Sequence, residues 1–263
     1  MSKIYTITSG KGGVGKSTTT ANLALGMAIL GKKVVAIDLD IGLRNLDMIL
    51  GLENRIVYNI IDLLEGRAKL NSALIRDKRN DNLKLLAASQ TNSKEDLSKE
   101  KFLNLLEQLK EQFDFVFIDS PAGIETGFSN AFAGADNIII VATPEISSIR
   151  DADRVVGILE ANGKKNISLI LNRVQPELVK KGEMMSQEDI LQILAIDLLG
   201  IVPNDPRMIE YTNKGEPAVL NKSSITANAY MNITRRLLGE DVPQIEFKPK
   251  GLFQKLFGKL QRT

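Results

Sequence analysis

Two lysines occupy one glycine-rich segment near the start of the chain, residues 10–17, which reads GKGGVGKS. The segment matches the pattern G-x-x-x-x-G-K-[ST], in which backbone N–H groups turn inward and bind phosphate oxygens. In this pattern Lys16 reaches the β- and γ-phosphates, and the Ser17 hydroxyl is placed to ligate Mg²⁺. Lys11 is a second lysine where the ordinary loop has one. The predicted phosphate-binding residues are Gly10, Lys11, Gly12, Gly13, Val14, Gly15, Lys16, Ser17 and Thr18.

The residues on either side of this loop have the pattern that it requires. An apolar, β-rich run precedes it at residues 4–8, and helical spacing follows at residues 18–30. A strand, a glycine-rich loop and a helix in this order are the setting that supports a phosphate-binding motif. A flexible surface loop rich in glycine and lysine is the alternative interpretation.

Carboxylates follow two further apolar runs. Residues 33–40, KVVAIDLD, end in Asp38 and Asp40, and residues 115–119, FVFID, end in Asp119. Since strands beside a phosphate loop end at the nucleotide, these carboxylates are expected to face it. The run before Asp119 is typical of a Walker-B aspartate, which supports Mg²⁺. Helix caps at strand ends are the alternative, and this alternative is stronger for Asp38 and Asp40 taken singly.

The composition excludes several classes of site. The chain has no cysteine, which excludes disulfides, iron–sulfur clusters and thiolate zinc sites. It has no histidine either, so proton transfer must use carboxylates, lysines or water. The net charge of +2 gives no global field of the kind that marks a nucleic-acid-binding protein.

Strand-like and helix-like segments alternate along the chain, which predicts an α/β fold: a doubly wound, mostly parallel sheet with helices on both faces. Continuous apolar runs such as residues 115–118 and 138–141 suit strands that are buried on both faces. The expected strands are 3–9, 33–38, 83–87, 114–119, 137–142, 167–171 and 199–202. The expected helices are 18–30, 43–50, 57–65, 98–112, 126–134, 148–161, 186–196 and 224–238.

The chain divides into an ATPase-type domain (1–238), a linker with two prolines (239–249) and a tail (250–263). Neither a signal peptide nor an apolar stretch of about 18 residues is visible, which predicts a cytoplasmic protein. On a helix the tail would gather its apolar residues within roughly 140° of arc, opposite a basic face. This pattern predicts an amphipathic helix that lies on an anionic membrane surface; a helix docked on its own domain is the alternative. The membrane-facing residues would be Leu252, Phe253, Leu256, Phe257 and Leu260.

Four segments together resemble one family. They are KGGVGKS in the loop, IDLDIGLRNLD (37–47), FIDSPAGIE (117–125) and PEISSIRDADR (144–154). This chain is similar over essentially its whole length to the MinD family of division-site-placement ATPases. That family belongs to the deviant Walker A group, beside the ParA partition proteins. The loop is shared by the whole group, whereas residues 41–47 and 120–125 resemble the MinD family specifically.

The resemblance implies an ATP-dependent homodimer, with ATP and Mg²⁺ as cofactors, on the cytoplasmic face of the cell membrane. Asp40 would position the attacking water, Asp119 would support Mg²⁺ through its water shell, and Lys11 would reach the phosphates of the other subunit. A lysine supplied in this way acts as an arginine finger does. Helix 144–161 would form part of the surface for two partners, the division inhibitor MinC and the ATPase-stimulating MinE. Asn172, Pro203 and Asp205 would bind the adenine end of ATP.

Three other functions fit part of the sequence. A flagellar-number ATPase or a ParA-type partition ATPase would use the same switch, but the latter needs a basic DNA-binding surface. A biosynthetic ligase resembling dethiobiotin synthetase would turn over ATP only with a small carboxylic or amine substrate. The lack of cysteine excludes a nitrogenase-type reductase.

Overall fold

The computed structural model describes residues 2–124 and 126–244. Within these residues, eight strands form one sheet in the order β3-β4-β2-β5-β1-β6-β7-β8. All neighbouring strands are parallel except β3 and β4, which form an antiparallel pair at one edge. The strands are β1 (Lys3–Thr8), β2 (Val34–Asp38), β3 (Leu74–Arg76), β4 (Leu83–Leu86), β5 (Phe115–Asp119), β6 (Asn137–Ala142), β7 (Ile167–Val174) and β8 (Asp197–Pro203).

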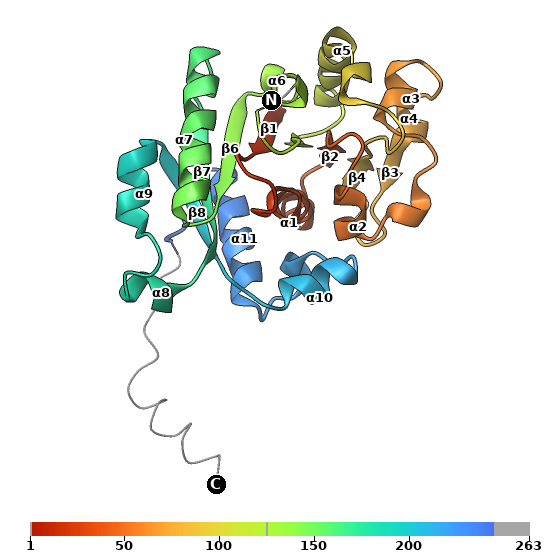
Figure 1. Cartoon of the computed structure of the whole chain (residues 1–263). Helices are drawn as coiled ribbons and strands as arrows, with labels where there is room; N and C mark the ends of the chain where they lie inside the picture. Colours follow the sequence, from red (N-terminus) through yellow and green to blue (C-terminus); the bar gives the residue numbers. More distant parts are fainter. Residues whose placement is uncertain (1, 125, 245–263) are drawn as a thin grey trace.

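Helices cover both faces of the sheet (Figure 1). Helices α1, α2 and α11 pack on one face, and α3, α5, α6, α7 and α9 pack on the other. The helices are α1 (Lys16–Ile29), α2 (Leu46–Leu50), α3 (Ile60–Leu64), α4 (Leu70–Ala73), α5 (Lys99–Lys110), α6 (Thr126–Ala133), α7 (Ile146–Ala161), α8 (Pro176–Lys180), α9 (Gln187–Leu194), α10 (Met208–Asn213) and α11 (Ile225–Leu237). Short 3₁₀ helices occupy Glu53–Arg55, Lys94–Asp96 and Ala218–Leu220.

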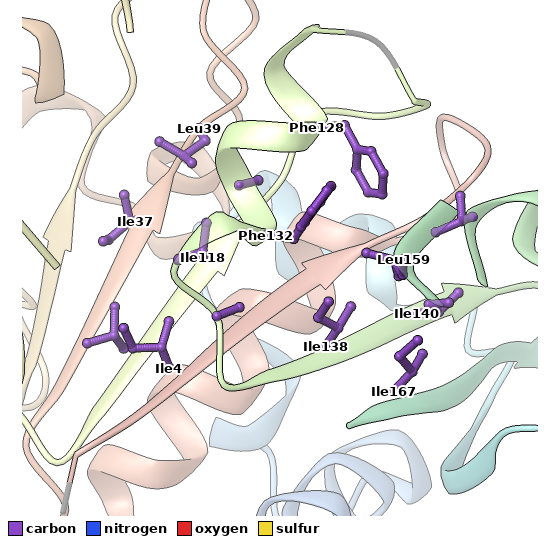
Figure 2. Close-up of a cluster of buried hydrophobic side chains, with 14 of the residues drawn as sticks. Ile4, Ile37, Leu39, Ile118, Phe128, Phe132, Ile138, Ile140, Leu159 and Ile167 are labelled. Carbon is purple, nitrogen blue, oxygen red and sulfur yellow. The ribbon is translucent and has the colours of Figure 1, made fainter. Parts of the chain in front are cut away.

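Two hydrophobic cores result, because alternate residues of each central strand face opposite sides of the sheet. In β5, Val116 and Ile118 face the core under α5, α6 and α7, whereas Phe115 and Phe117 face the core under α1 and α11. Figure 2 shows the first of these cores, where strand residues such as Ile118 and Ile138 meet Phe132 of α6. Burial on both faces explains why these strands are continuous apolar runs.

The predicted fold class is confirmed, and each expected strand is present within a few residues. Strand β3 was not predicted because three residues at a sheet edge carry no readable alternation. Helices α4, α8 and α10 have four to six residues, which is too short for a helical period. The helix expected over 43–50 begins only at Leu46, since the residues before it form a loop that Asp38 holds.

The predicted linker is described as far as Gln244, and the predicted tail, 250–263, lies outside the described residues. No helix within residues 2–124 and 126–244 combines the length and the apolar character needed to cross a membrane.

Candidate active site

The glycine-rich loop lies between β1 and α1, and it ends at the N-terminus of a 14-residue helix. The unpaired N–H groups and the dipole at such an end favour an anion. Gly15 caps the helix with a φ of 102°, and a Cβ there would lie 2.3 Å from Nδ2 of Asn172. A Cβ on Gly10 would lie 2.3 Å from the carbonyl oxygen of Asp151 in α7. Replacement of Gly10 would therefore require α7 to move, whereas replacement of Gly15 would strain the backbone and displace the Asn172 side chain.

Lys16 is buried beside two carboxylates, those of Asp40 and Asp119. Burial raises the pKa of both carboxylates, and the positive charge of Lys16 opposes this shift. The hydroxyls of Ser17 and Thr20 also lower the pKa of Asp119, and Thr20 Oγ1 donates a hydrogen bond to Asp119 Oδ1 at 3.1 Å. The structure thus brings Lys16, Ser17, Asp40 and Asp119 together, and their chemistry suits a nucleoside triphosphate.

The surroundings of Asp119 also fit a magnesium ion. Its Oδ2 is buried and has no hydrogen-bond partner among the residues that the structure describes. A buried carboxylate oxygen of this kind requires a partner, because its desolvation is otherwise uncompensated. Carboxylate and hydroxyl oxygens are ligands that Mg²⁺ takes, and the ion usually keeps several waters. Ser17 and Asp119 are therefore the residues that would hold Mg²⁺.

Asp38 and Asp40 have different environments, although they are two residues apart. Asp38 is fully buried and accepts hydrogen bonds from the backbone N–H groups of Asp40 (2.9 Å), Asn45 (3.1 Å) and Leu46 (3.1 Å). Its pKa is raised, first by burial and then by the charge of Asp119. Asp38 therefore has a structural role: its carboxylate caps the backbone N–H groups at the start of α2 and fixes the loop that carries Asp40. Asp40 is 9% exposed and lies near the charges of Lys16 and Lys94.

Lys11 contacts a different part of the molecule from Lys16. Its Nζ lies 3.2 Å from Oγ of Ser147 and 3.7 Å from Oε2 of Glu145, at the N-terminus of α7. The Lys11 side chain is 45% exposed. A half-exposed cation at the rim of the loop is accessible to a second molecule. The role of Lys11 across a dimer interface stays a prediction.

A cavity of about 380 Å³ lies beside the loop, and Asn172, Pro203 and Asp205, the residues predicted to bind adenine, all line it. The Asn172 amide is already engaged: Nδ2 donates to the carbonyl oxygen of Val14 at 2.8 Å, and Oδ1 accepts from the N–H of Arg173. Asn172 therefore holds the phosphate loop against the cavity. The remaining lining residues are Thr18, Arg173, Val202, Asn204, Pro206, Met208, Ile209, Thr226 and Tyr230.

Arg173 and the first turn of α10 line the same cavity, and the sequence did not indicate them. Arg173 has a φ of 57°, in a region where glycine is common and arginine is rare. Such strain concentrates at functional sites. Met208 and Ile209 belong to a six-residue helix that has no readable period. Asp205 is fixed at the cavity by Arg207 (2.9 Å) and Ser224 (3.1 Å), and its pKa is lowered, mainly by the hydrogen bond from Arg207.

The chain is similar to known proteins over nearly its whole length. A family model described as an AAA domain matches residues 2–171. A septum site-determining protein MinD of Helicobacter pylori is 56% identical, with 98% of this chain and 99% of that protein covered. The protein of the same name from Bacillus subtilis is 50% identical, with 97% of each chain covered.

Solved structures agree with these relatives. The chain superposes on MinD in a MinC:MinD cell division protein complex of Aquifex aeolicus with a TM-score of 0.89, at 49% identity. The superposition covers 94% of this chain and 100% of that one. The chain superposes on MinD of Pyrococcus horikoshii complexed with Mg-ADP with a TM-score of 0.81, at 31% identity, with coverage of 92% and 100%. This degree of similarity, together with the site just described, shows that the chain belongs to the MinD family of P-loop ATPases.

Proposed function

We propose that this protein is an ATP-hydrolysing switch that helps to place the division site. ATP binding drives the formation of a homodimer, the dimer binds the cytoplasmic face of the cell membrane through paired tails, and hydrolysis releases monomers. The observation that carries this proposal is the convergence of Lys16, Ser17, Asp40 and Asp119 at the N-terminus of α1, with Lys11 left half-exposed at the rim. Membership of a family of septum site-determining proteins supports it.

The chemistry is transfer of the γ-phosphoryl group to water, which depends on positioning and charge stabilisation. Lys16 and the N–H groups of the loop bind the phosphates, and Asp40 orients the attacking water. Ser17 and Asp119 would hold Mg²⁺, which would supply positive charge to neutralise the phosphates. The P. horikoshii structure with Mg-ADP supports the choice of nucleotide and ion. Because the chain has no histidine, Asp40 is a suitable group for this task.

Lys11 supplies the link between hydrolysis and dimerisation. Two lysines in one loop repel each other if they approach the same phosphate, and here they contact different groups. The Nζ of Lys11, which contacts Ser147 and Glu145 in the monomer, would move to the γ-phosphate of the second subunit in the dimer. Charge supplied in this manner makes hydrolysis depend on the partner subunit.

The A. aeolicus complex supports a MinC-type inhibitor as a partner of this chain. We further propose that a MinE-type activator binds the same surface, α7, whose exposed residues include Arg150 and Asp153. Because Lys11 contacts the N-terminus of α7, replacement of one partner by the other on this helix would also affect Lys11.

The tail provides membrane binding whose strength depends on dimerisation. The burial of five large apolar side chains favours binding of the tail, whereas the loss of conformational entropy on ordering the tail opposes it and is of similar size. One tail therefore binds marginally. Two tails on a dimer act at a high effective concentration, which strengthens binding by on the order of 10²-fold.

Sedimentation with anionic liposomes tests the proposed function. The wild-type protein is expected to sediment with ATP and to stay in the supernatant with ADP. Leu260→Glu, or deletion of residues 250–263, is expected to lower the amount of protein that sediments with liposomes in the presence of ATP by at least about tenfold. The reason is that Leu260 is near the centre of the predicted apolar arc, where a carboxylate meets acyl chains and anionic headgroups.

Gln254→Glu is the matched control, because it adds the same charge on the polar side of the predicted helix and should retain most of the sedimentation. Basal ATP hydrolysis and dimer formation should be unchanged in every tail variant. Unaltered sedimentation of Leu260→Glu, or a clear fall in its melting temperature, would contradict the membrane role of the tail.

A further inference from the structure

Arg79 is a largely buried arginine that lies outside the catalytic groups. Its side chain is 17% exposed, and it is paired with the fully buried carboxylate of Asp77. Nε donates to Asp77 Oδ1 at 3.0 Å and Nη2 donates to Asp77 Oδ2 at 2.5 Å. Two further hydrogen bonds go to backbone carbonyl oxygens, from Nη1 to Gly215 at 2.8 Å and from Nη2 to Leu50 at 2.7 Å. Four hydrogen bonds therefore use most of the five donors of the guanidinium group.

The two carbonyl groups belong to the ends of two different helices. Leu50 is the last residue of α2, and Gly215 follows α10 directly after its cap, Lys214. Leu50 is 29 residues and Gly215 is 136 residues from Arg79 in the sequence. The ends of helices leave carbonyl groups without intrahelical partners, and a cation at such an end is favourable. Arg79 thus binds the negative ends of both helices at once.

The two helix ends also touch directly. A Cβ on Gly215 would lie 2.4 Å from Cα of Gly51, and a Cβ on Gly51 would lie 2.8 Å from the carbonyl oxygen of Gly215. Both glycines have a φ of 62°, so both the conformation and the close approach require glycine. Figure 1 shows α10 lying next to α2. We call Asp77, Arg79, Gly51 and Gly215 the Arg79 cluster.

Each helix leads from this cluster to one half of the nucleotide site. Helix α2 begins at Leu46, whose N–H is bonded to Asp38, at the end of the loop that carries Asp40. Helix α10 begins at Met208, which together with Ile209 lines the cavity beside the loop. Both helices are short, five and six residues, so a shift at one end is transmitted to the other.

We propose that Arg79 is a positioning residue that ties the wall of the base-binding cavity to the loop carrying Asp40. Occupation of the cavity by the base of a nucleotide fixes α10, the Arg79 cluster transmits this order to α2, and the loop before α2 holds Asp40 in place. The inference rests on the proposed function only in assuming that the cavity receives the base of a nucleotide. It assigns an influence on Asp40 to a residue that does not touch the nucleotide.

Hydrogen–deuterium exchange on the full chain tests this coupling without requiring hydrolysis. Mg-pyrophosphate occupies the phosphate loop alone, whereas Mg-ADP also places a base in the cavity. The reporter amides are those of Gly51 and Leu52, which donate to Met48 and Asp47 at the end of α2. In the wild-type protein, saturating Mg-ADP is expected to slow exchange of these amides at least about fivefold more than Mg-pyrophosphate does, which is the lower end of typical coupling between sites.

Arg79→Met should abolish this difference between the two ligands, while protection of the phosphate loop and of residues 203–209 by Mg-ADP persists. Because Arg79→Met leaves Asp77 buried and unpaired, the double variant Arg79→Met/Asp77→Asn removes both charges and avoids that destabilisation. Arg76→Met is the matched control, since Arg76 lies on the same hairpin but is 66% exposed and pairs with exposed Asp81 at 3.4 Å. It should behave like the wild-type protein.

Three results would overturn the proposal. The first is equal protection of Gly51 and Leu52 by both ligands in the wild-type protein. The second is persistence of the difference in a folded Arg79 variant. The third is failure of both Arg79 variants to fold, because Arg79 would then act only on stability. Wild-type ATP hydrolysis is measured separately, so its absence would contradict the proposed function and leave this test intact.

Discussion

Lys16→Ala is expected to abolish ATP hydrolysis and ATP-dependent membrane binding. Loss of a cation from the transferring phosphates costs on the order of 10³-fold or more in kcat. The structure adds a second effect, because the charge of Lys16 opposes the burial that raises the pKa of Asp40 and Asp119. Without Lys16 both pKa values rise further, which favours the protonated carboxyls that neither orient water nor bind Mg²⁺. Steady-state release of phosphate by the purified variant is the measurement.

Lys94→Ala separates these two effects. Lys94 is a second cation whose charge lowers the pKa of Asp40, but it lies outside the phosphate loop. This variant should lose activity only slightly, and the loss should shrink as the pH rises. Normal hydrolysis by Lys16→Ala, or an equal loss in Lys94→Ala, would contradict the assignment of Lys16 to the phosphates.

The central half of the fold could be predicted because its signals are local. Strands β1, β2 and β5 are apolar runs that end in polar residues, and the glycine-rich loop identifies the edge of the sheet at which the site lies. The same reasoning predicts that Asp40 and Asp119 face the nucleotide, and in the structure the charge of Lys16 acts on both carboxylates. Their roles in hydrolysis and in Mg²⁺ binding remain proposals.

The parts that the sequence did not reveal depend on contacts between distant segments. Nothing near Arg79 indicates that its guanidinium group binds carbonyl groups 29 and 136 residues away. Asp38 and Asp40 look alike in the sequence, and only the fold of residues 40–46 turns three N–H groups toward Asp38. Similarly, the resemblance placed Asn172 at the adenine, but the folded loop also brings the Val14 carbonyl within reach of its amide.

The second large effect should distinguish the two catalytic roles proposed for Asp40 and Lys11. Asp40→Ala is expected to retain ATP binding and the dimer while kcat falls by about 10²–10⁴-fold, the usual contribution of a positioned acid or base. The reason is that Asp38, not Asp40, holds the loop through three backbone hydrogen bonds, so the loop should keep its shape. Multi-angle light scattering with ATP and assays of phosphate release measure the two properties.

Lys11→Ala is expected to lose both properties, with kcat lower by at least about 10³-fold and with a weakened ATP dimer. Its Nζ contacts only Ser147 and Glu145 among the described residues of the monomer, and the ion pair with Glu145 is exposed. Removal of an exposed pair changes the stability of a monomer by at most about 1 kcal/mol, so the melting temperature without nucleotide should hardly move. Lys33→Ala removes an exposed lysine far from the loop and controls for net charge.

Since Asp40 acts within one subunit and Lys11 across the interface, a mixture of the two variants provides the final discrimination. In a heterodimer of Lys11→Ala with Asp40→Ala, the site of the Lys11→Ala subunit has its own Asp40 and receives Lys11 from the Asp40→Ala subunit, whereas the other site lacks both residues. One complete site should therefore restore part of the hydrolysis in the mixture; a mixture as inactive as the two separate variants would place both residues in the same site within one subunit and contradict the role of Lys11 across the interface.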